Sequence, residues 1–160
     1  MFLRPKTNSP PQEVLEILSR GNTVQEAATS YFETIHCWFP IVSKKRMNIG
    51  LPMWDAGPDL AMLFLAMKLV TALPGAGEGF RPAESPLYTA AKRFLALLEA
   101  SGAVSLQYLQ AMLLVAIYEM GHAIYPAAWM TVGACSRYAD MIGIPSFRES
   151  WTVLGTCVRE

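Results

Sequence analysis

The stretch from Ser105 to Ile144 constrains the fold more than any other part of the chain. Ser105 is a good N-cap, and residues 106–120 follow it without a glycine or proline that would break a helix. Pro126 suits the first turn of a second helix, and Gly143 suits its end. We therefore predict two long helices that fold back on each other as a hairpin.

The first helix of this hairpin is apolar on nearly every side. One stripe at three- and four-residue spacing consists of Leu106, Leu109, Leu113, Ile117 and Met120. The stripe is widened, and the other side of the helix is also covered, by Met112, Leu114, Val115, Ala116 and Tyr118. Because a helix that is apolar all round belongs inside a bundle, we expect it to be the central helix.

Four further helices are predicted upstream. A short one follows a capping box of Ser9 and Gln12 and ends at Gly21, and a second runs from the capping box Thr23-x-x-Glu26 to about Trp38. The other two are Asp59–Leu73 and Leu87–Ala100, the latter opened by Ser85-Pro86. No alternation of period two exceeds four residues, so the fold class is all-α, an irregular bundle of about six helices. The short connection predicts that Leu87–Ala100 and the central helix are antiparallel neighbours.

The chain divides into three parts. Residues 1–22 form an N-terminal segment with one short helix, residues 23–144 form the main helical domain, and residues 145–160 form an irregular tail. Inside the domain, residues 41–58 are rich in turn formers, and residues 74–79 predict an exposed loop open to proteases.

Composition limits the classes of function. Hydrophobic residues make up 52% of the chain and charged residues only 16%, which indicates a heavily buried domain or a fragment of one. Lys plus Arg and Asp plus Glu number 13 each, and this balance argues against bulk electrostatic binding to nucleic acid or anionic lipid. The N-terminus lacks the apolar core of a signal peptide, and the apolar runs are shorter than the ~20 residues of a membrane span.

The cysteines give no metal or disulfide pattern. Cys37, Cys135 and Cys157 are widely spaced and odd in number, and no CxxC pair occurs. We expect reduced thiols in an intracellular protein, two of them buried. The nine methionines indicate adaptable packing and could line a pocket.

Glu119-x-x-His122 is the most suggestive pair, because one Glu-x-x-His is half of a di-iron bundle site. The chain has no second copy, so we interpret it as a polar pair at a helix end, with His122 bonded to backbone carbonyls. Adjacent His36 and Cys37 would point about 100° apart on a helix and cannot form a nucleophilic pair with each other. Pairing of Cys37 or Cys135 with His122 stays open.

Two charged clusters are weaker candidates. Lys44-Lys45-Arg46 could contact phosphate or serve as a localisation signal, although a solvated loop is the simpler interpretation. Arg137 and Asp140 predict a surface ion pair. We predict no catalytic and no metal-binding residues, and the cofactor-binding residues are left unassigned.

Several pieces of the sequence, taken in order, are similar to one known family. They are Tyr31-Phe32-x-x-Ile35-His36-x-x-Phe39-Pro40-Ile41-Val42, Asp59-Leu60 with Leu65-Ala66-Met67-Lys68-Leu69, Leu109-Gln110-Ala111, Tyr118-Glu119-x-Gly121-His122, Tyr125-Pro126-Ala127-Ala128 and Gly133-Ala134-Cys135-x-Arg137. Together they resemble the middle homology region, or fungal-specific transcription factor domain, of fungal zinc-cluster transcription factors. The resemblance covers Val24 to Ile144. Beyond it the family continues with an Arg-rich, Trp-containing segment, of which Arg148-Glu149-x-Trp151 matches a short part.

The resemblance implies a nuclear, non-catalytic domain that regulates transcription, often of a metabolic gene set. It also implies that zinc belongs to a six-cysteine module that this sequence does not contain, so we expect no cofactor and no specific DNA binding by this chain alone. Protein partners or a small-molecule effector are the expected ligands. The chain would then correspond to the front half of a larger helical regulatory domain, or to a shortened gene product.

The alternative is an all-α small-molecule-binding protein or enzyme with a pocket between helices. Convergent polar groups on apolar faces would favour it, and the sequence offers few, namely Glu119, His122 and Arg137.

Overall fold

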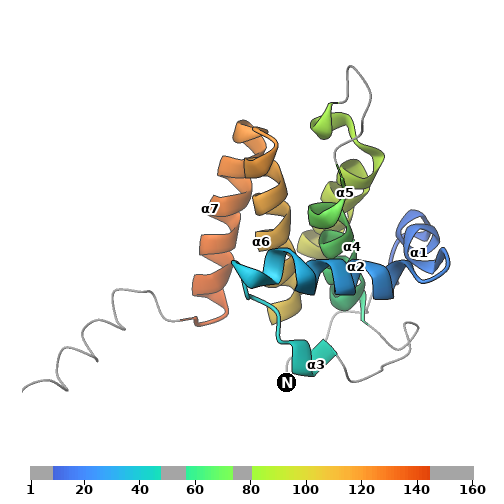
Figure 1. Ribbon diagram of the computed structural model, residues 1–160. Coiled ribbons are helices and arrows are strands. Elements are labelled where there is room, and N and C mark those ends of the chain that lie inside the picture. Colours follow the sequence, from blue (N-terminus) through green and yellow to red (C-terminus); the bar gives the residue numbers. More distant parts are fainter. Residues whose placement is uncertain (1–8, 48–56, 74–80, 145–160) are drawn as a thin grey trace, which may run out of the picture.

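The computed structural model describes residues 9–47, 57–73 and 81–144. The regular structure of these residues consists of seven α-helices and two 3-10 turns (Figure 1). Their bounds are α1 Gln12–Ser19, α2 Thr23–Glu33, η1 Ile35–Cys37, α3 Lys44–Met47, α4 Pro58–Thr71, η2 Pro82–Glu84, α5 Pro86–Ala100, α6 Leu106–Gly121 and α7 Tyr125–Met141. The predicted all-α class is confirmed.

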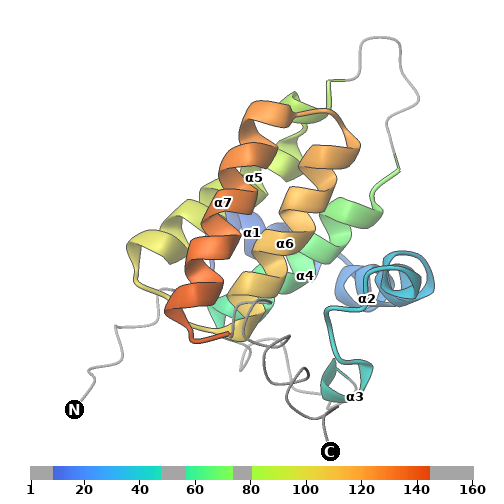
Figure 2. The same cartoon turned by 90° about the vertical axis from the view of Figure 1, so that its left-hand side faces the viewer.

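Helices α4 and α6 form the centre of the bundle and pack on each other more extensively than any other pair. Helix α7 covers one side of α6, while α2 and α5 lie against α4 (Figures 1 and 2). The buried side chains of α4 are Ala61, Met62, Leu63, Leu65, Ala66, Met67 and Leu69. The predicted central position of α6 is therefore confirmed, but α4 shares it.

Helix α5 packs mainly on α4, so the predicted close pairing of α5 with α6 is wrong at the level of the backbone. A short connection places the ends of two helices close together, but it does not determine which helix the rest of α5 packs against. Long side chains of α5 nevertheless reach α6, as the hydrogen bond from Tyr88 to Glu119 shows.

The predicted apolar stripe of α6 is buried only at Leu109. Leu106 and Met120 are 44% and 47% exposed, and Leu113 and Ile117 are half-buried. The residues that α6 buries are Tyr108, Leu109, Ala111, Met112, Leu114, Val115, Ala116, Tyr118 and Glu119. Because both faces of this helix are apolar, periodicity alone does not predict which of them is buried. The packing of α4 and α7 against α6 decides which face is covered.

The predicted ends of the hairpin are confirmed. The Ser105 hydroxyl accepts a hydrogen bond from the Tyr108 amide at 3.1 Å, which caps α6. Pro126 lies in the first turn of α7, and Gly143 has a φ of 77° just beyond its end.

Two other predicted caps are wrong. Helix α1 begins after Pro11, whose carbonyl accepts from the Val14 amide, and the Gln12 side chain donates to Glu16 rather than reaching back to Ser9. Thr23 is already inside α2, where its hydroxyl donates backward to the Arg20 carbonyl. Local side-chain bonds of this kind compete with capping.

Helix α2 ends at Glu33, before the predicted end at Trp38. The Thr34 hydroxyl donates to the Ser30 carbonyl at 2.6 Å, and the chain tightens into the η1 turn. The Tyr31 hydroxyl donates to the Phe39 carbonyl at 3.2 Å and holds the following turn against α2. The connection after it contains one helical turn, α3, where only turns are predicted. The predicted protease-sensitive loop 74–79 and the tail 145–160 lie outside the described residues.

Candidate functional site

Glu119 is the centre of a polar cluster that joins three helices. It lies on the inner face of α6 and is completely buried. Its Oε1 accepts a hydrogen bond from the Tyr88 hydroxyl of α5 at 2.7 Å and pairs with Lys92 Nζ at 2.9 Å. Lys92 also donates to the Thr131 hydroxyl of α7 at 3.1 Å, so the four side chains tie α5, α6 and α7 together.

The electrostatics of this cluster follow from burial. Burial, the hydrogen bond to Glu119 and the negative charge of Glu119 all raise the pKa of Tyr88 far above its usual value. The second carboxylate oxygen of Glu119, Oε2, has no hydrogen-bond partner among the described residues. A fully buried carboxylate does not meet a dissolved substrate, so the arrangement suits a structural clamp better than acid–base chemistry.

The structure separates the two members of Glu119-x-x-His122. Glu119 points into the core, whereas the His122 Nδ1 lies 2.9 Å from the Tyr118 carbonyl and its ring packs 4.1 Å from the Tyr118 ring centroid. The predicted contact of His122 with backbone carbonyl is confirmed. No group of three or more His, Cys, Asp or Glu side chains in the described part of the chain is arranged to hold a metal ion.

His36, Cys37 and Cys135 also lie in environments that suit a structural role. His36 packs edge-on against Phe32 at a centroid distance of 5.0 Å, and the exposed Cys37 donates to the Glu33 carbonyl. Cys135 is buried in the core, and burial raises the pKa of its thiol to about 11. Cys157 lies outside the described residues.

The two charged clusters differ from their predictions. Lys44 opens the short α3, with its ammonium 5.8 Å from the centroid of the Phe32 ring. The predicted ion pair between Arg137 and Asp140 is absent; the Arg137 guanidinium instead lies back over Gly133 on α7. A cation placed N-terminal to its anion on a helix is the less favourable order for such a pair.

A groove of about 1260 Å³ opens between α1, α2, α3, α4 and α6. Its apolar wall includes Val24, Phe32, Ile41, Leu60 and Phe64. The Gln110 amide of α6 donates to the Ile41 carbonyl at 2.6 Å and holds that part of the wall in place. The sequence did not predict this groove because its residues come from five separate elements. The methionines were expected to be able to line a pocket, and of these Met47 lines the groove.

The features above define the class of the protein: an all-α bundle domain whose polar cluster holds helices together and whose open site is an apolar groove. None of the helices in the described ranges has both the length and the apolar character needed to cross a membrane.

Comparison with known proteins identifies the family. The chain is 41% identical to transcription factor BOA15 of Botryotinia fuckeliana (strain B05.10) over 142 residues, which cover 86% of this chain and 78% of that protein. It therefore belongs to the family of fungal transcription factors that includes transcription factor BOA15.

Two longer relatives match a part of their length. The pigment biosynthesis transcriptional activator pigB of Monascus ruber is 31% identical over 118 residues, and transcription factor tazR of Aspergillus terreus (strain NIH 2624 / FGSC A1156) is 27% identical over 117 residues. Each match covers 70% of this chain but only 21% and 18% of the two relatives, so the chain spans about a fifth of their length. No family model and no solved structure matches the chain.

Proposed function

We propose that this chain is a non-catalytic regulatory region of the zinc-cluster type, equivalent to part of the middle homology region, and that it acts in the nucleus. The observation that carries the proposal is the 41% identity to transcription factor BOA15 over most of both chains. Residues from several of the segments that resemble the middle homology region also meet in one core, where Tyr31, Leu65 and Ala111 are fully buried. A shared core is what a common fold requires of such segments.

The regulated genes are proposed to be a metabolic set, since one relative is named as an activator of pigment biosynthesis. Transcript profiling of a strain with an early stop codon in this reading frame tests the proposal. We expect the transcripts of a physically linked group of biosynthetic genes to change several-fold, and restoration of the intact reading frame to reverse the change. An unaltered transcript profile under conditions where the protein is expressed would contradict a regulatory role.

The chain alone is proposed to bind neither zinc nor a specific DNA sequence. Its balanced charge, with 13 basic and 13 acidic residues, supports this, because DNA affinity depends on phosphate contacts by Lys and Arg. Purified protein should carry no stoichiometric zinc by elemental analysis. It should also give no salt-sensitive shift with DNA from the promoters of the regulated genes, and a sequence-specific shift would overturn the proposal.

The groove supports a second candidate function, the binding of a small apolar effector. Its volume is on the scale of ligand sites, and it combines apolar walls with the Lys44 ammonium near the Phe32 ring. Ala28 lines this groove, whereas Ala96 is an exposed alanine on α5 away from it.

The probe for this function is 8-anilinonaphthalene-1-sulfonate, which pairs an aromatic body with one negative charge. We expect saturable fluorescence enhancement with the wild-type protein, a loss of at least tenfold in affinity for Ala28→Trp, and no change for Ala96→Trp. Equal binding by both variants would place the dye elsewhere and remove the groove as an effector site.

A further inference from the structure

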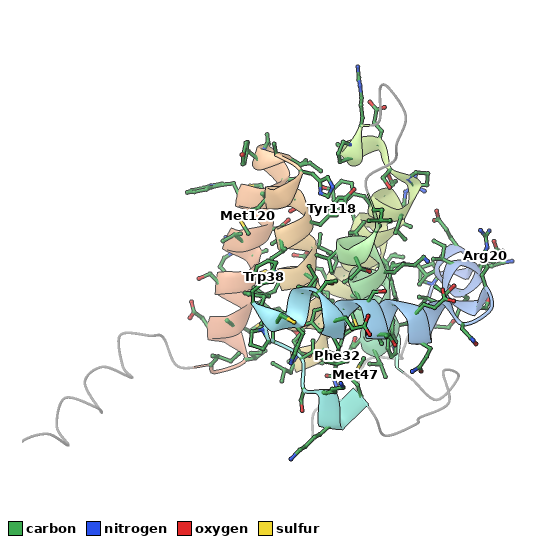
Figure 3. All side chains as sticks on the ribbon, viewed as in Figure 1. Arg20, Phe32, Trp38, Met47, Tyr118 and Met120 are labelled. Atoms are coloured by element: carbon green, nitrogen blue, oxygen red, sulfur yellow. The ribbon has the colours of Figure 1, made fainter. Side chains whose placement is uncertain are left out.

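The groove between α1, α2, α3, α4 and α6 follows one face of α2 along its whole length. Its lining includes Asn22, directly before this helix, and Glu33 at its end. The 11 residues of α2 extend over about 16 Å. Figure 3 labels Phe32 and Met47, which line the groove near α3, and Arg20 on the α1 side of the molecule. The groove therefore has the length of a short chain segment.

Apolar side chains of the groove are partly open to solvent. Leu15 of α1 is 44% exposed and lines the groove. Val24, Phe32, Ile41 and Phe64 pack against the core on one side and are only half-buried. Covering such side chains is favourable in proportion to the apolar area removed from water. An apolar segment held at the groove would therefore bind there.

The charged residues of the groove favour a basic occupant. Three charged residues line it, and two of them, Glu16 and Glu33, are acidic. The third is Lys44, whose ammonium lies 5.8 Å from the centroid of the Phe32 ring. None of the three forms a salt bridge with another described residue. The lining thus carries one more negative than positive charge, which selects for a basic segment over an acidic one.

Residues 1–8, which lie outside the described residues, have the complementary composition. Their sequence, MFLRPKTN, places the apolar run Met1-Phe2-Leu3 before the basic residues Arg4 and Lys6, and it contains no acidic residue. Pro5 disfavours helix at the residue before it and so favours an extended chain. The segment joins apolar and basic character in the way that the lining of the groove requires.

This segment is also attached at the groove. It continues through Ser9 into Pro10, and Pro10 is itself a lining residue. A fully extended segment of this length reaches about 26–29 Å, which exceeds the length of α2. The tail 145–160 instead follows Ile144, which does not line the groove, and its two basic and two acidic residues balance.

We propose that residues 1–8 bind in the groove of the same chain, with Phe2 and Leu3 against its apolar wall and the two basic side chains towards Glu16 and Glu33. Attachment favours this occupant over any free apolar partner. A segment on a short tether has an effective concentration on the order of millimolar, so even a weak contact keeps it bound for much of the time. A free partner would have to reach that concentration in solution.

Occupation of the groove would also regulate the binding of a small effector. In this respect the inference rests on the second candidate function proposed above, because the segment and the effector would compete for one site. The contact of residues 1–8 with the groove does not depend on that function, and it is tested first without any effector.

Photo-crosslinking of the full chain tests the contact. The reporter is p-benzoylphenylalanine, introduced in place of Phe2. We expect peptide mass spectrometry to find crosslinks within one chain, on lining residues such as Val24, Phe32 or Phe64. Ala28→Trp, which fills the groove, should lower the crosslink yield at least tenfold, whereas Ala96→Trp on α5 should leave it unchanged.

The charge argument has its own variant. Glu16→Lys combined with Glu33→Lys reverses the charge of the groove and should lower the crosslink yield about threefold. Far-UV circular dichroism verifies that each variant is folded. Thr29→Trp, at an exposed position of the groove, replaces Ala28→Trp if that variant is unfolded.

Four results would overturn the proposal. Crosslinks between two chains would identify a second copy as the occupant. Crosslinks only outside the groove, or a yield that does not change when the groove is filled, would show that the segment does not bind there. The same reporter in place of Phe147 tests the tail, and groove crosslinks from position 147 with none from position 2 would assign the groove to residues 145–160.

Regulation is measured separately with 8-anilinonaphthalene-1-sulfonate. The full chain with Phe2→Asp and Leu3→Asp should bind the dye about three- to tenfold more tightly than the wild-type protein, because the groove is then free more of the time. Equal affinities would overturn the regulatory part of the inference. If the dye binds neither protein, the groove is removed as an effector site, while the crosslinks still decide where residues 1–8 bind.

Discussion

Glu119 is the centre of the polar cluster between α5, α6 and α7. It is the one acidic side chain buried in the described core, and it accepts from Tyr88 and pairs with Lys92 through a single oxygen. Removing one partner of a buried pair leaves an uncompensated charge, which costs more than the pair itself contributes. The two partners of Glu119 are therefore expected to matter more for stability than any surface charge.

Substitution of Lys92 tests this expectation. Lys92→Met keeps the aliphatic stem but leaves the Glu119 charge with Tyr88 alone, so we expect a loss of roughly 2–3 kcal/mol in the free energy of unfolding. This lies below the usual cost for a buried pair because the Lys92 side chain is 37% exposed. Adding Glu119→Gln should recover part of the loss, because a neutral amide can still accept from Tyr88. Urea unfolding measures both, and an additive double variant would show that the pair is not coupled.

Helix α6 shows how capping and burial act on one element. Its N-terminus is closed by Ser105, whose backbone amide in turn donates to the Tyr138 hydroxyl of α7 at 2.8 Å. The Tyr138 hydroxyl donates to the Ala103 carbonyl at 2.9 Å, so the start of α6 is tied to the opposite helix of the hairpin. The capping residue thus serves both local and tertiary structure.

Ser105→Ala should lower the free energy of unfolding by about 1 kcal/mol, since the Tyr108 amide loses its acceptor. Ser9→Ala is the matched control: Ser9 is a sequence-predicted cap that makes no capping bond, and its removal should cost less than about 0.5 kcal/mol. Thermal unfolding followed by circular dichroism compares the two. Equal effects would mean that the Ser105 cap does not operate in solution.

The two faces of α6 are separated by a second pair of substitutions. Leu114 is fully buried, so Leu114→Ala should cost roughly 2–5 kcal/mol through lost burial and the resulting cavity. Its neighbour Leu113, on the predicted stripe, is half-buried. Leu113→Ala should therefore lower the free energy of unfolding by about half as much. Chemical unfolding of both variants measures the difference, and a larger loss for Leu113 would mean that the helix is rotated about its axis.

At the scale of the described core, five tyrosines and one cysteine thiol lie in or against it. Burial is the leading cause that raises the pKa of Tyr31, Tyr88, Tyr108, Tyr118 and Tyr138, and it raises that of the Cys135 thiol from 9.0 to about 11. A group whose pKa is higher in the folded state favours folding below its unfolded pKa. That contribution disappears as the pH rises toward the folded pKa.

We therefore expect the protein to lose stability on the alkaline side. Between pH 9 and pH 11, Cys135 alone should account for roughly 2–3 kcal/mol, and the buried tyrosines add to the loss above pH 10. Urea unfolding at pH 7, 9 and 10.5 measures the trend. Cys135→Ala should flatten the part of the profile nearest pH 9, and a free energy of unfolding that stays constant to pH 10.5 would contradict the burial of these groups.

Sequence alone determined the helical class, the hairpin of α6 and α7, the Ser105 cap and the break at Gly143, because each depends on residues within one or two helical turns. The resemblance carried by short segments from Tyr31 to Arg137 likewise pointed to the transcription factor family. Capping was less predictable at Ser9 and Thr23, where nearby side chains offered competing hydrogen bonds.

Only the tertiary structure decided which face of α6 is buried and which helix α5 packs against. It also decided that Glu119 contacts Lys92 and Tyr88 and not His122. It also decided the groove, which combines residues from separate elements. The physical reason is that a helix apolar on all sides can satisfy burial at many rotations about its axis. Only simultaneous packing against α4 and α7 selects one of them.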